Sequence, residues 1–230
     1  RPRRETVHFF RRKLLRWYAS HGRSFPWRET TDPYAILVSE ILLHQTWAGK
    51  VVPVYSQVLA KYPSAHRLAQ ANVNTLKTLL TSLGLLYRAE LLKSLGRAIR
   101  DRFDGRVPES SESLLSLAGV GPYTSQAVRC FAFGERAPIV DTNVVRLTSR
   151  FFGIRNAGSV SRVRRAAEHI ASETLPRRSA ARRFNFALLD FGASVCTCYA
   201  PSCTKCPLRT QCIANTHSWH LPRNSLDKPS

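Results

Sequence analysis

The stretch LLSLAGVGPYTSQAVRCFAFGERAPIVDTNVVR, residues 114–146, decides the fold. An apolar helical run ends at Gly119, and a second apolar run begins at Pro122. Glycine tolerates positive φ, so it suits a turn as short as Gly119-Val120-Gly121. Because proline fits the first turn of a helix, the free backbone N–H groups of the second helix would point out of the turn, where a phosphate can bind. The stretch therefore predicts a helix–hairpin–helix.

A single carboxylate follows this hairpin. Asp141 lies eighteen residues after Tyr123, immediately before another apolar run. A hairpin that holds a phosphate, followed by one carboxylate, suits a protein that grips a nucleic acid and acts on it. The alternative is structural: Gly-x-Gly joins two packed helices, and Asp141 is only a helix N-cap.

Composition narrows the class of partner. The 230 residues are 43% hydrophobic, which is enough to fill a core and argues against wholesale disorder. The 35 Lys and Arg against 15 Asp and Glu give a formal charge of +20, which favours a polyanionic partner. Nucleic acid is the first candidate and an anionic membrane surface the second, and a merely solvated basic surface is the alternative. No apolar stretch is long enough to span a bilayer, and no signal peptide is visible, although the chain begins at Arg1.

Apolar residues recur at helical spacing throughout the chain, and no segment shows sustained two-residue alternation. We therefore expect an all-α fold of many short helices and short loops. Asp32 and Ser110 are the expected N-caps of two of these helices. The expected helices cover residues 4–20, 33–47, 50–61, 65–71, 75–83, 87–102, 142–152, 159–173 and 179–191.

Five of the six cysteines lie close together, in the pattern Cys196-x6-Cys203-x2-Cys206-x5-Cys212 with Cys198 as an extra. One tight group in a long chain predicts a metal centre in a reducing compartment rather than a disulfide framework. Four such thiolates suit either a zinc ion or an iron–sulfur cluster, and the chemistry alone does not choose between them. Four unligated thiols are the alternative, but a segment with so few core-forming residues needs a ligated centre to hold its shape.

Together these motifs resemble a known family, the helix–hairpin–helix DNA glycosylases with a Gly/Pro-rich loop and an aspartate, also called the endonuclease III superfamily. The resemblance covers about residues 5–215. Several separate motifs look like the branch that contains adenine and mismatch glycosylases. These are FPWR at 25–28, SEILLHQT at 39–46, SLGLLYRAE at 82–90, LAGVGPYTSQAV at 117–128 and VDTNVVRL at 140–147.

This resemblance implies a two-lobed fold with DNA and the active site between the lobes. Residues 26–131 would form a six-helix barrel domain that contains the hairpin. Residues 1–25 and 132–215 would form an iron–sulfur cluster domain, followed by a frayed tail over 216–230. The resemblance also implies a 4Fe-4S cluster, with Cys198 and Cys130 as spare thiols. The implied cluster ligands are Cys196, Cys203, Cys206 and Cys212.

The resemblance further assigns three catalytic residues. Asp141 matches the aspartate that stabilises positive charge on the sugar or activates water. Tyr123 stands where members that cut the strand carry Lys, and a phenol cannot form a Schiff base. Tyr followed by Thr looks like the thymine/uracil mismatch branch, although an aromatic packed in a helix interface is the alternative. Glu40 matches a carboxylate that protonates adenine or contacts a flipped pyrimidine; otherwise it caps a helix or pairs with an arginine.

A second group of residues is expected to contact DNA. Gln45 matches a glutamine that fills the gap left by the flipped base, and His44 departs from the Gln or Arg of relatives. Leu85 and Leu86 stand where adenine glycosylases carry two tyrosines and would push into the base stack, with ordinary core packing as the alternative. The full expected set is Gln45, His44, Leu85, Leu86, Gly119, Val120, Gly121 and Thr124.

The leading functional hypothesis is a monofunctional DNA glycosylase that excises thymine or uracil opposite guanine and leaves an abasic site. Adenine glycosylases carry a further C-terminal domain that reads 8-oxoguanine, and this sequence ends soon after Cys212, which favours a mismatch enzyme. The expected partner is double-stranded DNA with a mismatched or damaged base, bound by a monomer in a prokaryotic cytoplasm, with no membrane. The alternatives are an adenine glycosylase core, a non-catalytic helix–hairpin–helix DNA-binding protein and a zinc-stabilised binding module.

Overall fold

The computed structural model describes residues 1–154 and 159–216, and within these ranges the regular structure is entirely helical. The all-α prediction is therefore confirmed. The frayed tail predicted for 216–230 lies, beyond Thr216, outside the described residues. The chain divides into two compact units. One unit is Ser24–Phe133, and the other combines Arg1–Arg23 with the described residues from Gly134 onward.

No helix in the described ranges is both long and apolar enough to cross a bilayer.

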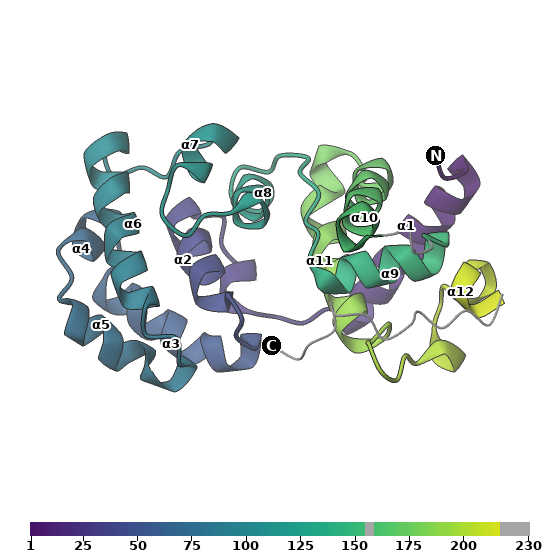
Figure 1. Ribbon diagram of the computed structural model, residues 1–230, viewed down its shortest axis with the longest axis horizontal. Helices are drawn as coiled ribbons and strands as arrows, with labels where there is room; N and C mark the ends of the chain where they lie inside the picture. The colour runs from purple at the N-terminus through teal and green to yellow at the C-terminus, as the bar shows by residue number, and fades with distance from the viewer. Residues whose placement is uncertain (155–158, 217–230) are drawn as a thin grey trace. The chain divides into compact units, whose positions relative to one another are not determined.

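The unit Ser24–Phe133 is built around α2 and α6 (Figure 1). Every side chain of α2 from Tyr34 to Leu42 is buried, as expected for a central helix. α6 packs against α4 and α5, and a Cβ added at Gly96 of α6 would lie 2.7 Å from the backbone N of Ala69, so only glycine allows this approach. The helices of this unit are η1 (Pro26–Arg28), α2 (Pro33–Leu43), α3 (Ala48–Lys61), α4 (Ala65–Ala69), α5 (Val73–Leu80), η2 (Thr81–Leu83), α6 (Arg88–Phe103), α7 (Ser111–Leu115) and α8 (Pro122–Phe131).

Both N-caps predicted from the sequence are confirmed. The Asp32 Oδ1 accepts a hydrogen bond of 3.0 Å from the Tyr34 N–H at the start of α2. The Ser110 Oγ accepts one of 3.1 Å from the Ser113 N–H at the start of α7. Each cap satisfies an N–H group that the first turn of a helix would otherwise leave without a partner.

The predicted helix over 33–47 is wrong at its C-terminal end. α2 stops at Leu43, and Gln45 takes a positive φ of 52°, which a helix cannot contain. The physical cause lies far along the chain, because the guanidinium of Arg88 donates hydrogen bonds of 2.6 Å to the carbonyls of Leu42 and His44. These carbonyls sit at the end of a helix, where no further N–H of the helix reaches them. The predicted helix over 65–71 also ends early, at Ala69, whereas the one over 75–83 begins two residues earlier and reaches Leu83 as α5 followed by the 3-10 helix η2.

The second unit is held by a cluster of phenylalanine rings. The Phe10 ring of α1 lies 4.6 Å from that of Phe151, 5.1 Å from that of Phe152 and 6.2 Å from that of Phe184. α1 packs on α11, and α9 packs on both α10 and α11. The helices of this unit are α1 (Arg4–His21), α9 (Thr142–Phe152), α10 (Val160–Thr174), α11 (Arg178–Ser194), η3 (Cys203–Lys205), η4 (Arg209–Gln211) and α12 (Ile213–Thr216).

Candidate functional site

The hairpin predicted from the sequence joins α7 to α8, and its two glycines have different roles. Gly119 has a φ of 77°, and an added Cβ would lie 2.6 Å from Leu91, so this position requires glycine. Gly121 is extended, and an added Cβ would meet nothing within 4 Å. Between them Val120 is buried and donates its N–H to the Leu117 carbonyl, which anchors the turn. The space in front of Gly121 is therefore open.

This open space lies at the N-terminus of α8. No side chain caps that helix, and Pro122 occupies its first turn. N–H groups at a helix N-terminus carry partial positive charge and bind anions, phosphate among them. The local geometry of the hairpin is therefore compatible with the predicted contact to a phosphate.

Two of the predicted DNA-binding residues meet directly. The Nε2 of His44, just after α2, lies 3.3 Å from the Oγ1 of Thr124 on α8. Thr124 is buried, and the pKa of His44 is lowered by its own burial and by the charge of Arg88. The imidazole is therefore uncharged at neutral pH. Tyr123, next to Thr124, is half-buried in the first turn of α8.

Glu40 is the one carboxyl on the central helix α2. Its side chain is 5% exposed, and burial raises its pKa from 4.5 to about 7, against the opposing charge of Arg28. An ionised carboxylate loses much of its hydration in such a setting, so the neutral acid is favoured. Near neutral pH, Glu40 can therefore donate a proton or a hydrogen bond.

Asp141 lies at the N-terminus of α9 and is held by both carboxylate oxygens. Its Oδ1 accepts a hydrogen bond of 2.7 Å from the Val144 N–H, and its Oδ2 accepts one of 2.7 Å from the Asn143 Nδ2. Burial raises the pKa of Asp141, whereas the bonds from Val144 and Asn143 and the charge of Arg146 lower it. Asp141 is thus an N-cap, as the structural alternative held, but its surroundings also orient and stabilise the ionised carboxylate.

A short chain of hydrogen bonds continues from Asn143 towards the cysteine segment. Arg146 donates to the Asn143 Oδ1 at 2.6 Å, to the Gly192 carbonyl at 2.8 Å and to the Cys196 carbonyl at 2.9 Å. α9 approaches α11 closely here, because a Cβ added at Gly192 would lie 2.8 Å from the Asn143 Cβ. The sequence did not single out Asn143 or Arg146. The sequence features that could have identified them are the motif VDTNVVRL at 140–147, which contains both, and their place on the helix that begins after Asp141.

The four predicted ligand cysteines lie near one another. Burial raises the pKa of Cys206 to about 11, and charges on Cys196, Cys212 and Cys203 add to that effect. Two of these thiols also contact α9. The Arg150 Nη1 lies 3.5 Å from the Cys196 Sγ, and the Cys212 Sγ lies 3.6 Å from the Arg150 carbonyl. Cys130, predicted to be a spare thiol, is fully buried in α8.

Four cysteine thiols can hold either of two kinds of metal centre. In residues 1–154 and 159–216, no group of three or more His, Cys, Asp or Glu side chains is arranged to hold one metal ion. Zinc would draw four sulfurs to about 2.3 Å from a single point. An iron–sulfur cubane instead binds each cysteine at a different iron atom, so its ligands stand further apart.

Two loops expose the residues predicted to enter the base stack. The Gln45 loop (residues 44–47) carries Gln45 with a φ of 52° and Trp47, whose exposure is 71%. The leucine loop (residues 84–87) carries Leu85, with a φ of 50° and 38% exposure, and Leu86 with 42% exposure. Ordinary core packing, the alternative role for Leu85 and Leu86, does not explain side chains that are this exposed. Positive φ at residues other than glycine is uncommon and clusters at functional sites.

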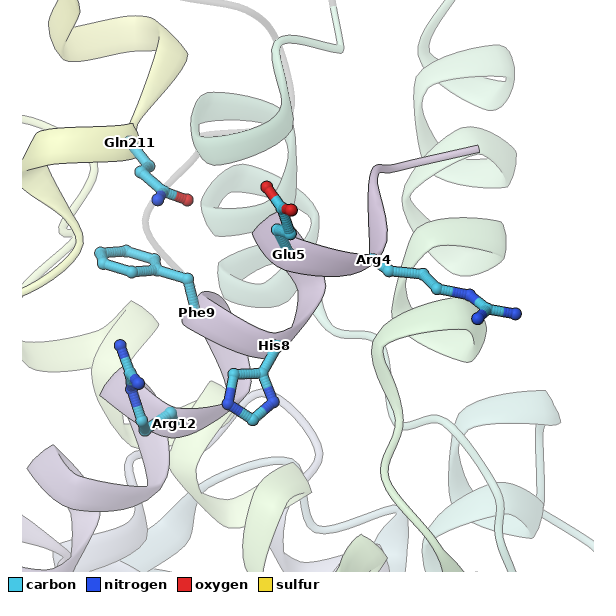
Figure 2. Close-up of a pocket in the computed structure, with 6 residues that line it drawn as sticks. All are labelled: Arg4, Glu5, His8, Phe9, Arg12 and Gln211. Carbon is cyan, nitrogen blue, oxygen red and sulfur yellow. The ribbon is translucent and has the colours of Figure 1, made fainter.

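A separate hollow of about 400 Å³ lies on the other unit, along α1 and η4 (Figure 2). Phe9 and Gln211 border one side of it, and Arg4 points away from both. Its lining is basic overall, but it includes none of the residues that the sequence motifs predicted. The residues that form it are Arg4, Glu5, His8, Phe9, Arg12 and Gln211.

Comparison with known proteins assigns this arrangement to a family. The family described as HhH-GPD superfamily base excision DNA repair protein matches residues 38–173. A thymine/uracil-DNA glycosylase of Pyrobaculum aerophilum is 39% identical over 202 residues, which are 86% of this chain and 88% of that protein. An adenine DNA glycosylase of Mycobacterium tuberculosis is 39% identical over 197 residues, which are 85% of this chain and 64% of that protein.

A solved structure supports the same assignment. A thermostable thymine-DNA glycosylase superposes with a TM-score of 0.87 at 35% identity, over 93% of this chain and 98% of that chain. The chain therefore belongs to the HhH-GPD superfamily of base excision DNA repair proteins. The family and the helical fold inferred from the sequence motifs are both confirmed.

Proposed function

We propose that the protein is a monofunctional DNA glycosylase that removes thymine or uracil opposite guanine and leaves an abasic site. The observation that carries this proposal is the setting of Asp141, an oriented carboxylate at which two hydrogen bonds and the charge of Arg146 oppose the rise in pKa that burial causes. The base preference rests on the Tyr123-Thr124 pair and on the likeness to thymine and thymine/uracil glycosylases.

The proposed reaction is hydrolysis of the N-glycosidic bond. As the bond between the base nitrogen and the sugar carbon breaks, its electron pair leaves with the base and positive charge develops on the sugar. The carboxylate of Asp141 stabilises that charge and accepts a proton from the attacking water, whose oxygen bonds to the sugar carbon. The departing base takes up a proton, so the products are a free base and an abasic site.

Glu40 is proposed to act on the base rather than on the sugar. Its raised pKa keeps much of the side chain protonated near neutral pH. The carbonyl oxygens of thymine and uracil accept hydrogen bonds, so a neutral carboxyl stabilises the negative charge that develops on these bases as they leave.

Strand cleavage is not part of the proposed reaction. Enzymes that cut the strand after base removal need an amine to attack the sugar and form a Schiff base. The position where they carry Lys is occupied here by Tyr123, in the first turn of α8. A phenol cannot form that intermediate, so the abasic product stays intact.

Binding to duplex DNA is proposed to use the hairpin and the two exposed loops. The open N-terminus of α8 would hold a backbone phosphate, with Gly119, Val120, Gly121 and Thr124 shaping the turn. Gln45, Leu85 and Leu86 would enter the base stack, with His44 supporting Gln45. The formal charge of +20 predicts binding that weakens steeply with salt.

We propose a monomer that acts in a reducing, cytoplasmic compartment of a prokaryote.

A 4Fe-4S cluster is proposed as the cofactor, held by Cys196, Cys203, Cys206 and Cys212. The x6-x2-x5 spacing of these cysteines in the sequence and the mutual influence of their thiols support it. When bound, the cluster fixes the fold of residues 196–212, and Arg146 and Arg150 of α9 contact the start of that segment. Visible absorbance of the purified protein together with equal iron and sulfide content would confirm the cluster, and zinc in their place would exclude it.

We also propose that residues 26–131 form the hairpin domain and that residues 1–25 and 132–215 form the cluster domain.

A panel of duplex oligonucleotides tests the base preference. The duplexes carry G·T, G·U, A·G, A·8-oxoguanine or an oxidised pyrimidine, and products are resolved after alkali. We expect release of thymine and uracil opposite guanine and none of adenine. The Asp141→Asn variant is the matched control, because asparagine still caps α9. Release of adenine alone would support the second candidate, an adenine glycosylase, which the raised pKa of Glu40 and the 39% identical adenine enzyme favour.

A further inference from the structure

Arg88, the first residue of α6, is fully buried. Its guanidinium donates hydrogen bonds of 2.6 Å to three uncharged acceptors, the carbonyls of Leu42 and His44 and the hydroxyl of Thr46. Its Nε has no partner. Burying a cation costs free energy even when its hydrogen bonds are made. The negative end of the α2 dipole offsets part of that cost, because these carbonyls end the helix.

The same residue is bonded to both exposed loops. In the Gln45 loop its Nη2 holds the His44 carbonyl and the Thr46 Oγ1, which lie on either side of Gln45. At the leucine loop its backbone N–H donates to the Leu85 carbonyl at 3.1 Å. The next N–H, that of Ala89, donates to the Leu86 carbonyl at 3.1 Å. One residue therefore joins two loops that lie about forty residues apart in the sequence.

Each loop also carries one residue in the left-handed region of φ. Gln45 has a φ of 52° and Leu85 a φ of 50°, and neither is a glycine. Such conformations persist only where the surrounding structure enforces them. The bonds that flank Gln45 come from the Arg88 side chain, and the bond to the Leu85 carbonyl comes from the Arg88 backbone N–H.

We propose that Arg88 is a positioning residue that holds the Gln45 loop and the leucine loop as one rigid, two-pronged wedge that opens the duplex at the target base. This inference rests on the proposed function of the protein as an enzyme that flips a base out of duplex DNA. A wedge fixed before binding loses less conformational entropy when it enters the stack than two loops that must order separately. Arg88 itself is buried and touches no DNA, so its effect on the duplex is indirect.

The test uses Arg88→Lys, because an ammonium lacks the planar fork that reaches all three acceptors. The first measurement is the fluorescence of 2-aminopurine placed beside a G·T mismatch, with the Asp141→Asn change present in every protein so that the base stays attached. We expect the variant to bind the duplex with a similar Kd but to give less than half of the wild-type rise in fluorescence.

The second measurement is the single-turnover rate on two substrates. One is a fully paired duplex with a single G·U, and the other places the same G·U in a three-nucleotide bubble, where unstacking needs little help from the protein. We expect Arg88→Lys to lower the rate about 10- to 100-fold on the paired duplex and less than about 3-fold on the bubble. A purely structural role would lower both rates alike.

Arg11→Lys is the matched control. Arg11 of α1 also caps the C-terminal end of a helix by donating to three carbonyls, those of Glu173, Thr174 and Leu175. It lies in the unit that lacks the two loops. Its substitution should lower the melting temperature without changing the ratio of paired to bubble rates.

The outcomes separate the two proposals. If Arg88→Lys lowers the rate only on the paired duplex and reduces the rise in fluorescence, the role of Arg88 is supported. If it leaves the ratio of paired to bubble rates unchanged, as expected for Arg11→Lys, the proposal is overturned. If Arg88→Lys does not fold, Thr46→Val removes one acceptor, and the absence of any duplex-specific loss in that variant overturns the proposal. Release of adenine alone by the wild type would overturn the proposed base preference, yet 2-aminopurine placed beside an A·G mismatch would still report whether Arg88 is needed to open the duplex.

Discussion

Asp141 and Glu40, the two carboxyls proposed to take part in the reaction, have different surroundings. Asp141 begins a helix, where a backbone N–H, the Asn143 amide and the Arg146 charge all favour its ionised form against the effect of burial. Glu40 lies within a helix whose side chains are buried almost throughout, and burial outweighs Arg28 to raise its pKa to about 7. Burial thus raises the pKa of both carboxyls, but only Asp141, at the start of a helix, accepts hydrogen bonds that oppose that rise.

This difference assigns the two acids different chemistry. A carboxylate held ionised stabilises a cation and accepts a proton, whereas a neutral carboxyl donates one. The rate should therefore rise with pH as Asp141 ionises and fall as pH passes about 7, where Glu40 ionises.

The largest expected effect comes from Asp141→Asn. The amide can still accept the Val144 N–H bond and cap α9, but it cannot stabilise a positive sugar or take a proton from water. We expect single-turnover base release to fall by at least about 10³-fold. Gel-shift measurements should show that binding of the mismatched duplex is retained, and loss of binding would mean that the residue serves the fold instead.

Asn143→Ala should have the next largest effect. It removes the bond to the Asp141 Oδ2, which lowers the pKa of that carboxyl. We expect a rate about 10-fold lower and an acid limb of the pH–rate profile displaced to higher pH. Thr142→Ala, an exposed neighbour on the same helix, is the control. An acid limb that stays in place in Asn143→Ala would contradict the assignment of that limb to Asp141.

Glu40→Gln should change the alkaline limb of the pH–rate profile. Glutamine still donates a hydrogen bond to a pyrimidine carbonyl but does not ionise, so the fall in rate above pH 7 should disappear. Below that pH we expect the rate on G·U to drop by no more than about 10-fold. A profile that keeps its alkaline limb would show that another group controls it.

The smallest expected effect is on stability. Because the pKa of Glu40 is raised from 4.5 to about 7 on folding, the folded state binds the proton more tightly. Stability is then lost as pH rises from about 4.5 through about 7, by up to about 3 kcal/mol, and Glu40→Gln should lack that loss. Urea unfolding of both proteins at pH 5 and pH 8 checks this, and equal pH dependence in the two would contradict it.

Sequence reasoning succeeded where the signal was local. The caps at Asp32 and Ser110 and the turn at Gly119 follow from residues within one helical turn of each feature. The cysteine spacing and the order of the hairpin and Asp141 are local in the same sense. These patterns were enough to predict the helical fold and the family.

What the sequence did not predict depends on residues far apart. α2 ends at Leu43 because of Arg88, whose partner Leu42 lies 46 positions away. Arg146 reaches Cys196 across 50 positions. The raised pKa of Glu40 likewise comes from burial by the fold rather than from any neighbour in the chain. No periodicity or motif contains such information.

The central claim is that water, and not a protein amine, releases the base. Its most direct test is incubation with a G·U duplex in the presence of borohydride, alongside the same reaction resolved with and without alkali. We expect uracil release, strand breaks only after alkali and no covalent protein–DNA product. A borohydride-trapped complex, or strands cut without alkali, would contradict it.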